Sequence, residues 1–237
     1  MKKIWFLLLF AFTFQFSANA QFKDLLNKAK KTIGSPVEDS TGAGLKEALV
    51  NGVEAAVDQL SATNGYFDSP YKILIPKEAQ QVVSKVKMVP GFQNVEQDLI
   101  KKMNEAAEIA AKKASPIFVG AIKELSFKDA MSILMGDKNA ATQYLDDKTR
   151  PGLYSEFMPV IQSSLDEVNA RTYWKSVVDQ YNKIPFIKKL NPELDDHVNQ
   201  YALNGLFALV EKKEEGIRGD VSQRTSPLLR DVFSKQD

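Results

Sequence analysis

The stretch "LKEALVNGVEAAVDQLS", residues 45–61, decides the fold class of this chain. Its apolar residues recur every three to four positions, which is the spacing of one face of an α-helix. Asn64-Gly65 follows shortly after and predicts a left-handed turn that ends the helix. We therefore expect an amphipathic helix whose inner face carries Leu45, Leu49, Gly52, Val53, Ala56, Val57 and Leu60.

The same periodicity recurs on the C-terminal side. Only Ile73-Leu74-Ile75 has an extended pattern, and it is too short to imply a sheet. We predict an all-α fold, a single-domain helical bundle of about eight to nine helices over 45–237 with no significant sheet. Beyond 45–61, the main helical segments are 76–88, 94–125, 150–168, 171–184, 193–218 and 226–234.

Proline, glycine and capping residues predict where these helices break. Ser115-Pro116 predicts a kink or break inside 94–125. Ser126 with Asp129 predicts a capping box. In the stretch 129–149, Gly136 predicts a left-handed stop and Asp137 the cap of the next helix. Arg150-Pro151-Gly152 then predicts another break.

The first twenty residues, "MKKIWFLLLFAFTFQFSANA", have the basic start, apolar run and small-residue end of a secretory signal peptide. No Cys follows, so we expect an exported protein, periplasmic or secreted, that is not a lipoprotein. Residues 21–44 predict an amphipathic helix and a linker, and peripheral membrane contact through 21–33 is one use for that helix. We expect no transmembrane span in the mature chain.

The composition excludes several classes of function. Removing residues 1–20 removes two lysines and no acid, which takes the net charge from +1 to about −1. A balanced charge argues against a nucleic-acid partner. The chain has no Cys and one His, His197, so we expect no disulfide, no thiol chemistry, no metal site and no cofactor. The loop from Asp137 resembles the start of an EF-hand, but Thr142 and Lys148 replace two residues that calcium binding requires.

The remaining chemistry lies in scattered polar residues. Glu105 and Glu108 are three residues apart and share one side of a helix. They could act as paired carboxylates in acid–base chemistry, but we favour surface ion pairs with Lys101 and Lys112. If their helix is packed on all sides, Asn104 or Glu105 needs a buried partner, for which Arg is the natural choice. The full candidate polar constellation is Asn104, Glu105, Glu108, Asp129, Thr142, Arg218 and Arg224.

Two further features admit alternative interpretations. Arg218, Arg224 and Arg230 either tie the C-terminus to the body of the protein or bind an anion. His197 follows Asp195-Asp196, which favours the first turn of a helix over a catalytic pair. Thr142 lies in the middle of a predicted helix and has no local role, so its hydroxyl needs a partner from elsewhere.

Five segments in this order carry a family resemblance: "LKEALVNGVEAAVDQLSATNGYF", "IKKMNEAAEIAAKKASPIF", "FKDAMSILMGDKNAATQYL", "YALNGLF" and "EEGIRGDVSQRTSPLLRDVF". Together they resemble the bacterial domain-of-unknown-function family 4197, over residues 45–234. The resemblance implies an exported, mostly helical protein without an assigned activity, so it transfers no catalytic residue.

Three functions follow as hypotheses. The first is a non-enzymatic envelope protein that binds a partner protein or surface. The second is a binder of an apolar or anionic small molecule between helices. The third is an enzyme that uses carboxylates such as Glu105, Glu108 or Asp129.

Overall fold

The computed structural model describes residues 40–76, 80, 83–84, 93–167, 169–186, 188–191 and 193–234. Within these ranges it contains eight α-helices and a short 3-10 helix but no strand, which confirms the all-α prediction. The predicted signal peptide, the helix at 21–33 and most of the helix at 76–88 lie outside the described residues. The helices are α2 (Ser40–Ser61), α4 (Val95–Ala111), α5 (Ala114–Glu124), α6 (Phe127–Leu134), α7 (Ala140–Asp166), α8 (Ala170–Tyr181), α9 (Leu194–Gly219) and α10 (Pro227–Ser234), with η1 at Val221–Gln223.

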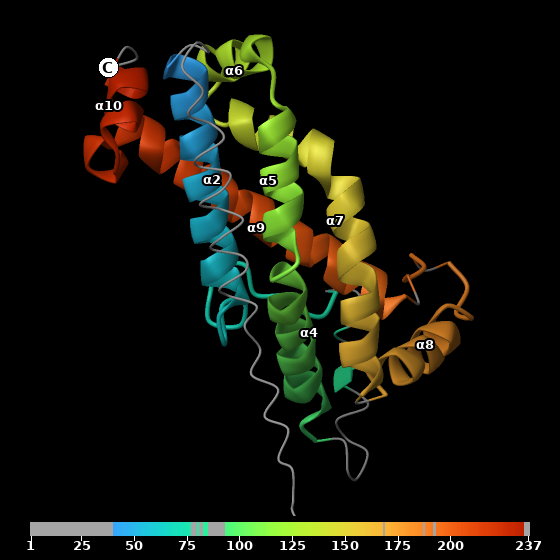
Figure 1. Cartoon of the computed structure of the whole chain (residues 1–237). Helices are drawn as coiled ribbons and strands as arrows, with labels where there is room; N and C mark the ends of the chain where they lie inside the picture. Colours follow the sequence, from blue (N-terminus) through green and yellow to red (C-terminus); the bar gives the residue numbers. More distant parts are fainter. Residues whose placement is uncertain are drawn as a thin grey trace, which may run out of the picture. The chain divides into compact units, whose positions relative to one another are not determined.

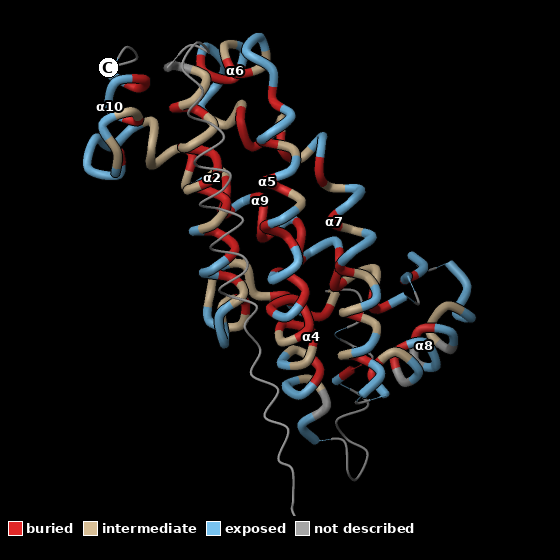
Figure 2. The backbone as a smooth tube through the Cα atoms, in the orientation of Figure 1, coloured by how far each residue is buried: buried red, intermediate tan, exposed pale blue. Residues whose placement is uncertain are grey.

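Helix α9 packs against four other helices. It crosses α2 and α7 obliquely and also contacts α4 (Figure 1). Its inner face is buried at Val198, Ala202, Leu206 and Val210. Tyr201 lies at the edge of that face and is 52% exposed. Figure 2 shows buried residues gathered where these helices meet.

The small residues of α4 let neighbouring helices approach closely. Ala106, Ala107 and Ala110 have no exposed surface, and α4 packs against α2, α7 and α9. The predicted break near Pro116 is confirmed, since α4 ends at Ala111 and α5 begins at Ala114. Pro116 lies in the first turn of α5. Backbone N–H groups there have no acceptor within the helix, so a proline costs the helix no hydrogen bond.

The predicted break at Arg150-Pro151-Gly152 is wrong. Helix α7 continues through both Pro151 and Pro159. Each proline removes the hydrogen bond to the carbonyl four residues earlier, which belongs to Asp147 and Ser155 respectively. All four residues are exposed, so water can solvate the two released carbonyls.

The turn between α6 and α7 also differs from its prediction. Gly136 is not left-handed; it is required by close packing, because a Cβ there would lie 2.8 Å from the carbonyl of Ser132 and 2.9 Å from the Cβ of Ala140. Asp137 does not cap α7, whose N-cap residue is Asn139, and the Asn139 side chain makes no capping hydrogen bond. The predicted capping box of Ser126 and Asp129 is confirmed at the start of α6. None of the described helices is long and apolar enough to span a membrane.

Candidate functional site

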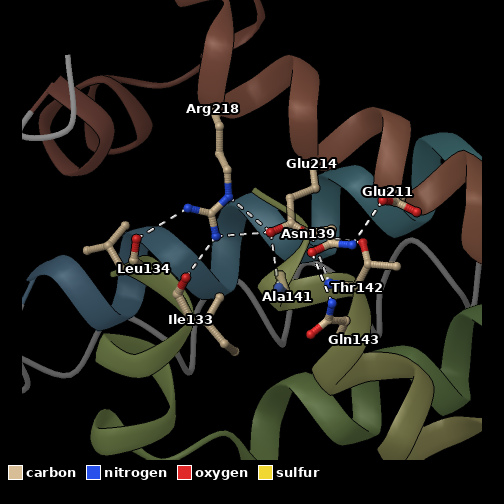
Figure 3. A network of polar contacts seen from close by, with 9 residues as sticks. All are labelled: Ile133, Leu134, Asn139, Ala141, Thr142, Gln143, Glu211, Glu214 and Arg218. Carbon is tan, nitrogen blue, oxygen red and sulfur yellow. Dashed lines mark hydrogen bonds and ion pairs between the residues drawn. The ribbon is translucent and has the colours of Figure 1, made fainter. Parts of the chain in front are cut away.

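A carboxylate from α9 caps the start of α7. Glu214 accepts hydrogen bonds from the backbone N–H of Ala141 at 3.0 Å and of Thr142 at 2.8 Å, and from the Thr142 hydroxyl at 2.8 Å (Figure 3). The two N–H groups lie in the first turn of α7, where a helix provides no partner of its own. The Thr142 hydroxyl, which has no local role in the sequence, therefore bonds to the capping carboxylate.

Arg218, one turn further along α9, binds both Glu214 and the end of α6. Its Nε donates to the Glu214 carboxylate at 3.0 Å, and Nη2 donates to the Ile133 carbonyl at 2.8 Å (Figure 3). A third bond from Nη1 reaches the Leu134 carbonyl at 3.3 Å. An anion at a helix N-terminus and a cation at a helix C-terminus each oppose the partial charge at that end. The pair therefore stabilises both sides of the α6–α7 turn.

This network is largely sealed from water. Glu214 is 8% exposed, and only 11% of the Arg218 side-chain surface is accessible. Asn139, at the edge of the network, donates to Glu211 at 3.0 Å. A pocket of about 20 Å³, room for roughly one water-sized group, adjoins the Glu214–Arg218 pair. Its wall is apolar and includes Leu49, Val53, Leu145, Val210 and Phe233.

The other two arginines of the C-terminal region also bind backbone carbonyls. Arg224 is 2% exposed and donates to the carbonyls of Ile217 at 3.1 Å and Arg218 at 2.8 Å, in the last turn of α9. Arg230 donates to the Arg224 carbonyl at 3.2 Å. These contacts favour the structural alternative for the three arginines over an anion site.

A second pair of buried polar residues lies one turn apart on α4. The Asn104 side chain accepts from the N–H of Ile73 and donates to its carbonyl, both at 2.9 Å, as a neighbouring strand would. Glu108 accepts from the N–H groups of Asn64, Tyr66 and Phe67 at 3.1–3.3 Å. The surface ion pair expected for Glu108 is therefore wrong, as is the arginine partner expected for Asn104.

These contacts fix the connector 62–76 to the body of the protein. Tyr66 within it is fully buried and donates its hydroxyl to the Ala202 carbonyl of α9 at 2.7 Å. Burial, with a smaller effect from Glu108, raises the pKa of Tyr66 far above its usual value. The ring is therefore neutral, and the connector is held from two helices at once.

The remaining members of the predicted constellation lie apart from these two groups. Glu105 pairs with Lys102 at 2.7 Å and Lys101 at 3.8 Å, as the ion-pair interpretation expects. Asp129 belongs to the exposed capping box of α6. The structure thus links Thr142 with Arg218 through Glu214, brings Arg224 to the Arg218 carbonyl, places Asn104 and Glu108 together, and separates Glu105 and Asp129. In the part of the chain that the structure describes, no three His, Asp or Glu side chains group as metal ligands.

Sequence reasoning missed Glu214 and a third polar cluster between α7, α8 and α9. Asp195, 4% exposed, accepts from Gln162 at 2.6 Å and pairs with Arg171 at 3.2 Å. The available signal for Glu214 was its position four residues before Arg218, which is the spacing of a helical ion pair. No comparable signal marks Asp195 as buried, because acids in a first helical turn are usually solvated.

One exposed surface combines aromatic and apolar side chains. Leu74 and Tyr201 are each 52% exposed. His197 lies between them, with Nε2 3.0 Å from the Leu74 carbonyl and its ring centroid 4.5 Å from that of Tyr201. Tyr71 packs on Gly205, one turn beyond Tyr201, where an added Cβ would lie 3.0 Å from the Tyr71 Cβ. We call Tyr71, Leu74, His197 and Tyr201 the aromatic surface.

The fold and these polar groups define an all-α protein in which buried Asn104, Glu108, Glu214 and Arg224 bind backbone groups at helix ends and in connectors. The chain belongs to the family described as Protein of unknown function (DUF4197), whose model matches residues 35–234. No curated protein and no solved structure matches the chain.

Proposed function

We propose that this is an exported, non-enzymatic protein of the cell envelope that binds a partner protein through the aromatic surface. The observation that carries the proposal is the exposure of Leu74 and Tyr201 on either side of His197. Single exposed apolar side chains are ordinary in proteins, but adjacent ones with Tyr among them are typical of binding surfaces.

The buried polar residues support this proposal by holding the surface in place. Leu74 belongs to the connector that Asn104 and Glu108 fix to α4, and His197 and Tyr201 belong to α9. A surface whose backbone is already fixed loses little conformational freedom on binding, which favours affinity. Glu108, one of the carboxylates that could have formed a catalytic group, is instead engaged in holding this connector.

Photo-crosslinking in the native cell tests the partner. A photoreactive residue in place of Tyr201 is expected to give a discrete crosslinked product, which is lost when Leu74→Asp is added. The matched control carries the photoreactive residue in place of Met135, the C-cap residue of α6, which is 75% exposed. Equal crosslinking from both positions, or a product insensitive to Leu74→Asp, would overturn the proposal.

Export has a separate test, because it rests on residues 1–20 alone. We expect the protein purified from cells to begin at Gln21 and to be recovered with the envelope fraction. A chain that retains Met1 and is found in the cytoplasmic fraction would contradict export. The crosslinking experiment would still test the partner separately.

The pocket beside Glu214 and Arg218 favours a second candidate, a binder of a small apolar group between helices. Its wall is apolar and its polar edge is occupied by the ion pair, so it suits an uncharged group of about the size of a methyl. Pressurisation with xenon should populate the pocket in the parent protein but not in Leu49→Phe, which fills it. Xenon-induced chemical-shift changes that are equal in the two proteins would refute this candidate.

A further inference from the structure

The connector between α8 and α9 presents two apolar side chains to solvent. Ile184 is 48% exposed, and Phe186 is fully exposed. Phe186 also has a left-handed backbone, with φ 63°. A bulky residue rarely adopts this conformation, which persists only where the surrounding structure enforces it. In Figure 2 this connector, which follows α8, is drawn mostly as exposed.

The base of the connector supplies that surrounding structure. Asn182 exchanges two hydrogen bonds with the backbone of Leu190, each 2.9 Å long. Lys189 donates through its ammonium group to the carbonyls of Asn182 and Ile184. Trp174, buried in α8, donates its indole N–H to the Asn191 carbonyl at 3.2 Å. The two ends are therefore joined, and the apolar tip is held away from the core.

The charge of this connector differs from that of the chain as a whole. Residues 182–192 contain Lys183, Lys188 and Lys189 and no acidic residue, although the whole chain is nearly neutral. An apolar, aromatic tip flanked by lysines has the chemistry of a segment that enters the interface of an anionic bilayer. Burial in the protein core or against a purely apolar partner would instead disfavour three positive charges in one connector.

We propose that the tip of the α8–α9 connector docks this protein on a membrane of anionic phospholipid. Ile184 and Phe186 enter the headgroup region, and the positive charges of Lys183, Lys188 and Lys189 attract the anionic lipid surface. The proposal is independent of the partner that we assign to the aromatic surface, because it uses different residues and a different ligand.

A fluorescent probe at the tip tests this docking directly. The chain has no Cys, so Ile184→Cys gives a single site for an environment-sensitive nitrobenzoxadiazole label. On addition of phosphatidylglycerol vesicles we expect the emission to rise and shift to the blue, and phosphatidylcholine vesicles should produce little change. The matched control is the same label at Phe127→Cys, which is 55% exposed on α6 and should remain in water.

Substitutions in the labelled chain separate charge from insertion. Lys183→Gln with Lys188→Gln should raise the lipid concentration needed for half-binding by roughly 30-fold, from about 1 kcal/mol per lysine. Phe186→Ser should raise it by about ten-fold or more. Lys112→Gln with Lys113→Gln removes the same charge from an exposed position elsewhere and should change it less than two-fold.

All these variants share the same N-terminal segment, so lipid binding through that segment would contribute equally to each of them. No emission change at position 184, an equal change at position 127, or equal responses to the two lipids would overturn the proposal. Loss of binding in Lys112→Gln/Lys113→Gln equal to that in Lys183→Gln/Lys188→Gln would also overturn it, since net charge alone would then explain the attraction.

Discussion

Replacement of Glu214 by alanine should be among the most destabilising single changes in this protein. The variant leaves the N–H groups of Ala141 and Thr142 without their partner and leaves Arg218 without its buried counter-ion. Removal of one member of a buried ion pair typically costs about 3–5 kcal/mol. For a protein of this size we expect the melting temperature to fall by roughly 6–20 °C.

Glu215 provides a matched control at the next position. It pairs with Lys138 at 2.8 Å, but 78% of the lysine side chain and 40% of the glutamate side chain are exposed. Exposed pairs of this kind contribute little to stability because water and salt screen them. Glu215→Ala should therefore leave the urea midpoint almost unchanged.

A double-mutant cycle identifies the ion pair as the cause. If Glu214 and Arg218 act as a unit, Glu214→Ala with Arg218→Met should cost less than the two single changes added together, by about 0.5–3 kcal/mol. Urea unfolding of the four proteins gives this coupling energy. The reasoning is refuted if the coupling is zero, or if Glu214→Ala is no more damaging than Glu215→Ala.

Three further predictions concern other contacts. Asn104→Leu should lower the unfolding free energy by roughly 1–3 kcal/mol for each backbone group of Ile73 that it leaves unpaired, and amide exchange at Ile73 should accelerate; an unchanged rate would contradict it. Gly44→Ala should lower the unfolding free energy by about 1–3 kcal/mol, because its Cβ would lie 2.5 Å from Val232 of α10. Gly120→Ala, whose Cβ would have nothing within 4 Å, should instead raise the unfolding free energy by roughly 0.5–1 kcal/mol. Equal effects of the two substitutions would refute the packing argument. The hydrogen bond to Asp196, with burial, raises the pKa of Tyr154 from 10.0 to about 12, so the neutral ring stabilises the fold fully below pH 10 and less as the pH rises to 12. In Tyr154→Phe the unfolding free energy should fall less over that pH range than in the parent protein. If it falls equally in both proteins, the Tyr154 hydroxyl has no part in the decline.

Helix existence was predictable here because it depends on local periodicity. The stripe from Leu45 to Leu60 appears in the sequence and is buried in the structure. Helix continuity was less predictable. Pro151 indicates a break by its own chemistry, but α7 continues because the carbonyls that lose their partners face water. That exposure depends on packing between distant helices, which the sequence near Pro151 does not contain.

The partners of the buried polar residues could not be predicted for the same reason. Asn104 and Glu108 bind backbone groups at Asn64, Tyr66, Phe67 and Ile73, and backbone groups leave no mark in a sequence. Pairing rules based on charge therefore directed Glu108 toward Lys112 and Asn104 toward an arginine. Thr142 was the exception, because a hydroxyl without a local role in a helix already required a partner from elsewhere.

These backbone partners also bear on where a ligand could act. A substrate that approached Glu214 would first have to displace three N–H or O–H donors and Arg218, and hydrogen bonds to a charged group contribute about 1.5–3 kcal/mol each. Displacing these donors would also leave the N–H groups in the first turn of α7 without their capping partner. The aromatic surface and the α8–α9 connector carry no such penalty, since their apolar side chains already face solvent. Ligand binding at these surfaces thus leaves the internal hydrogen bonds of the fold intact.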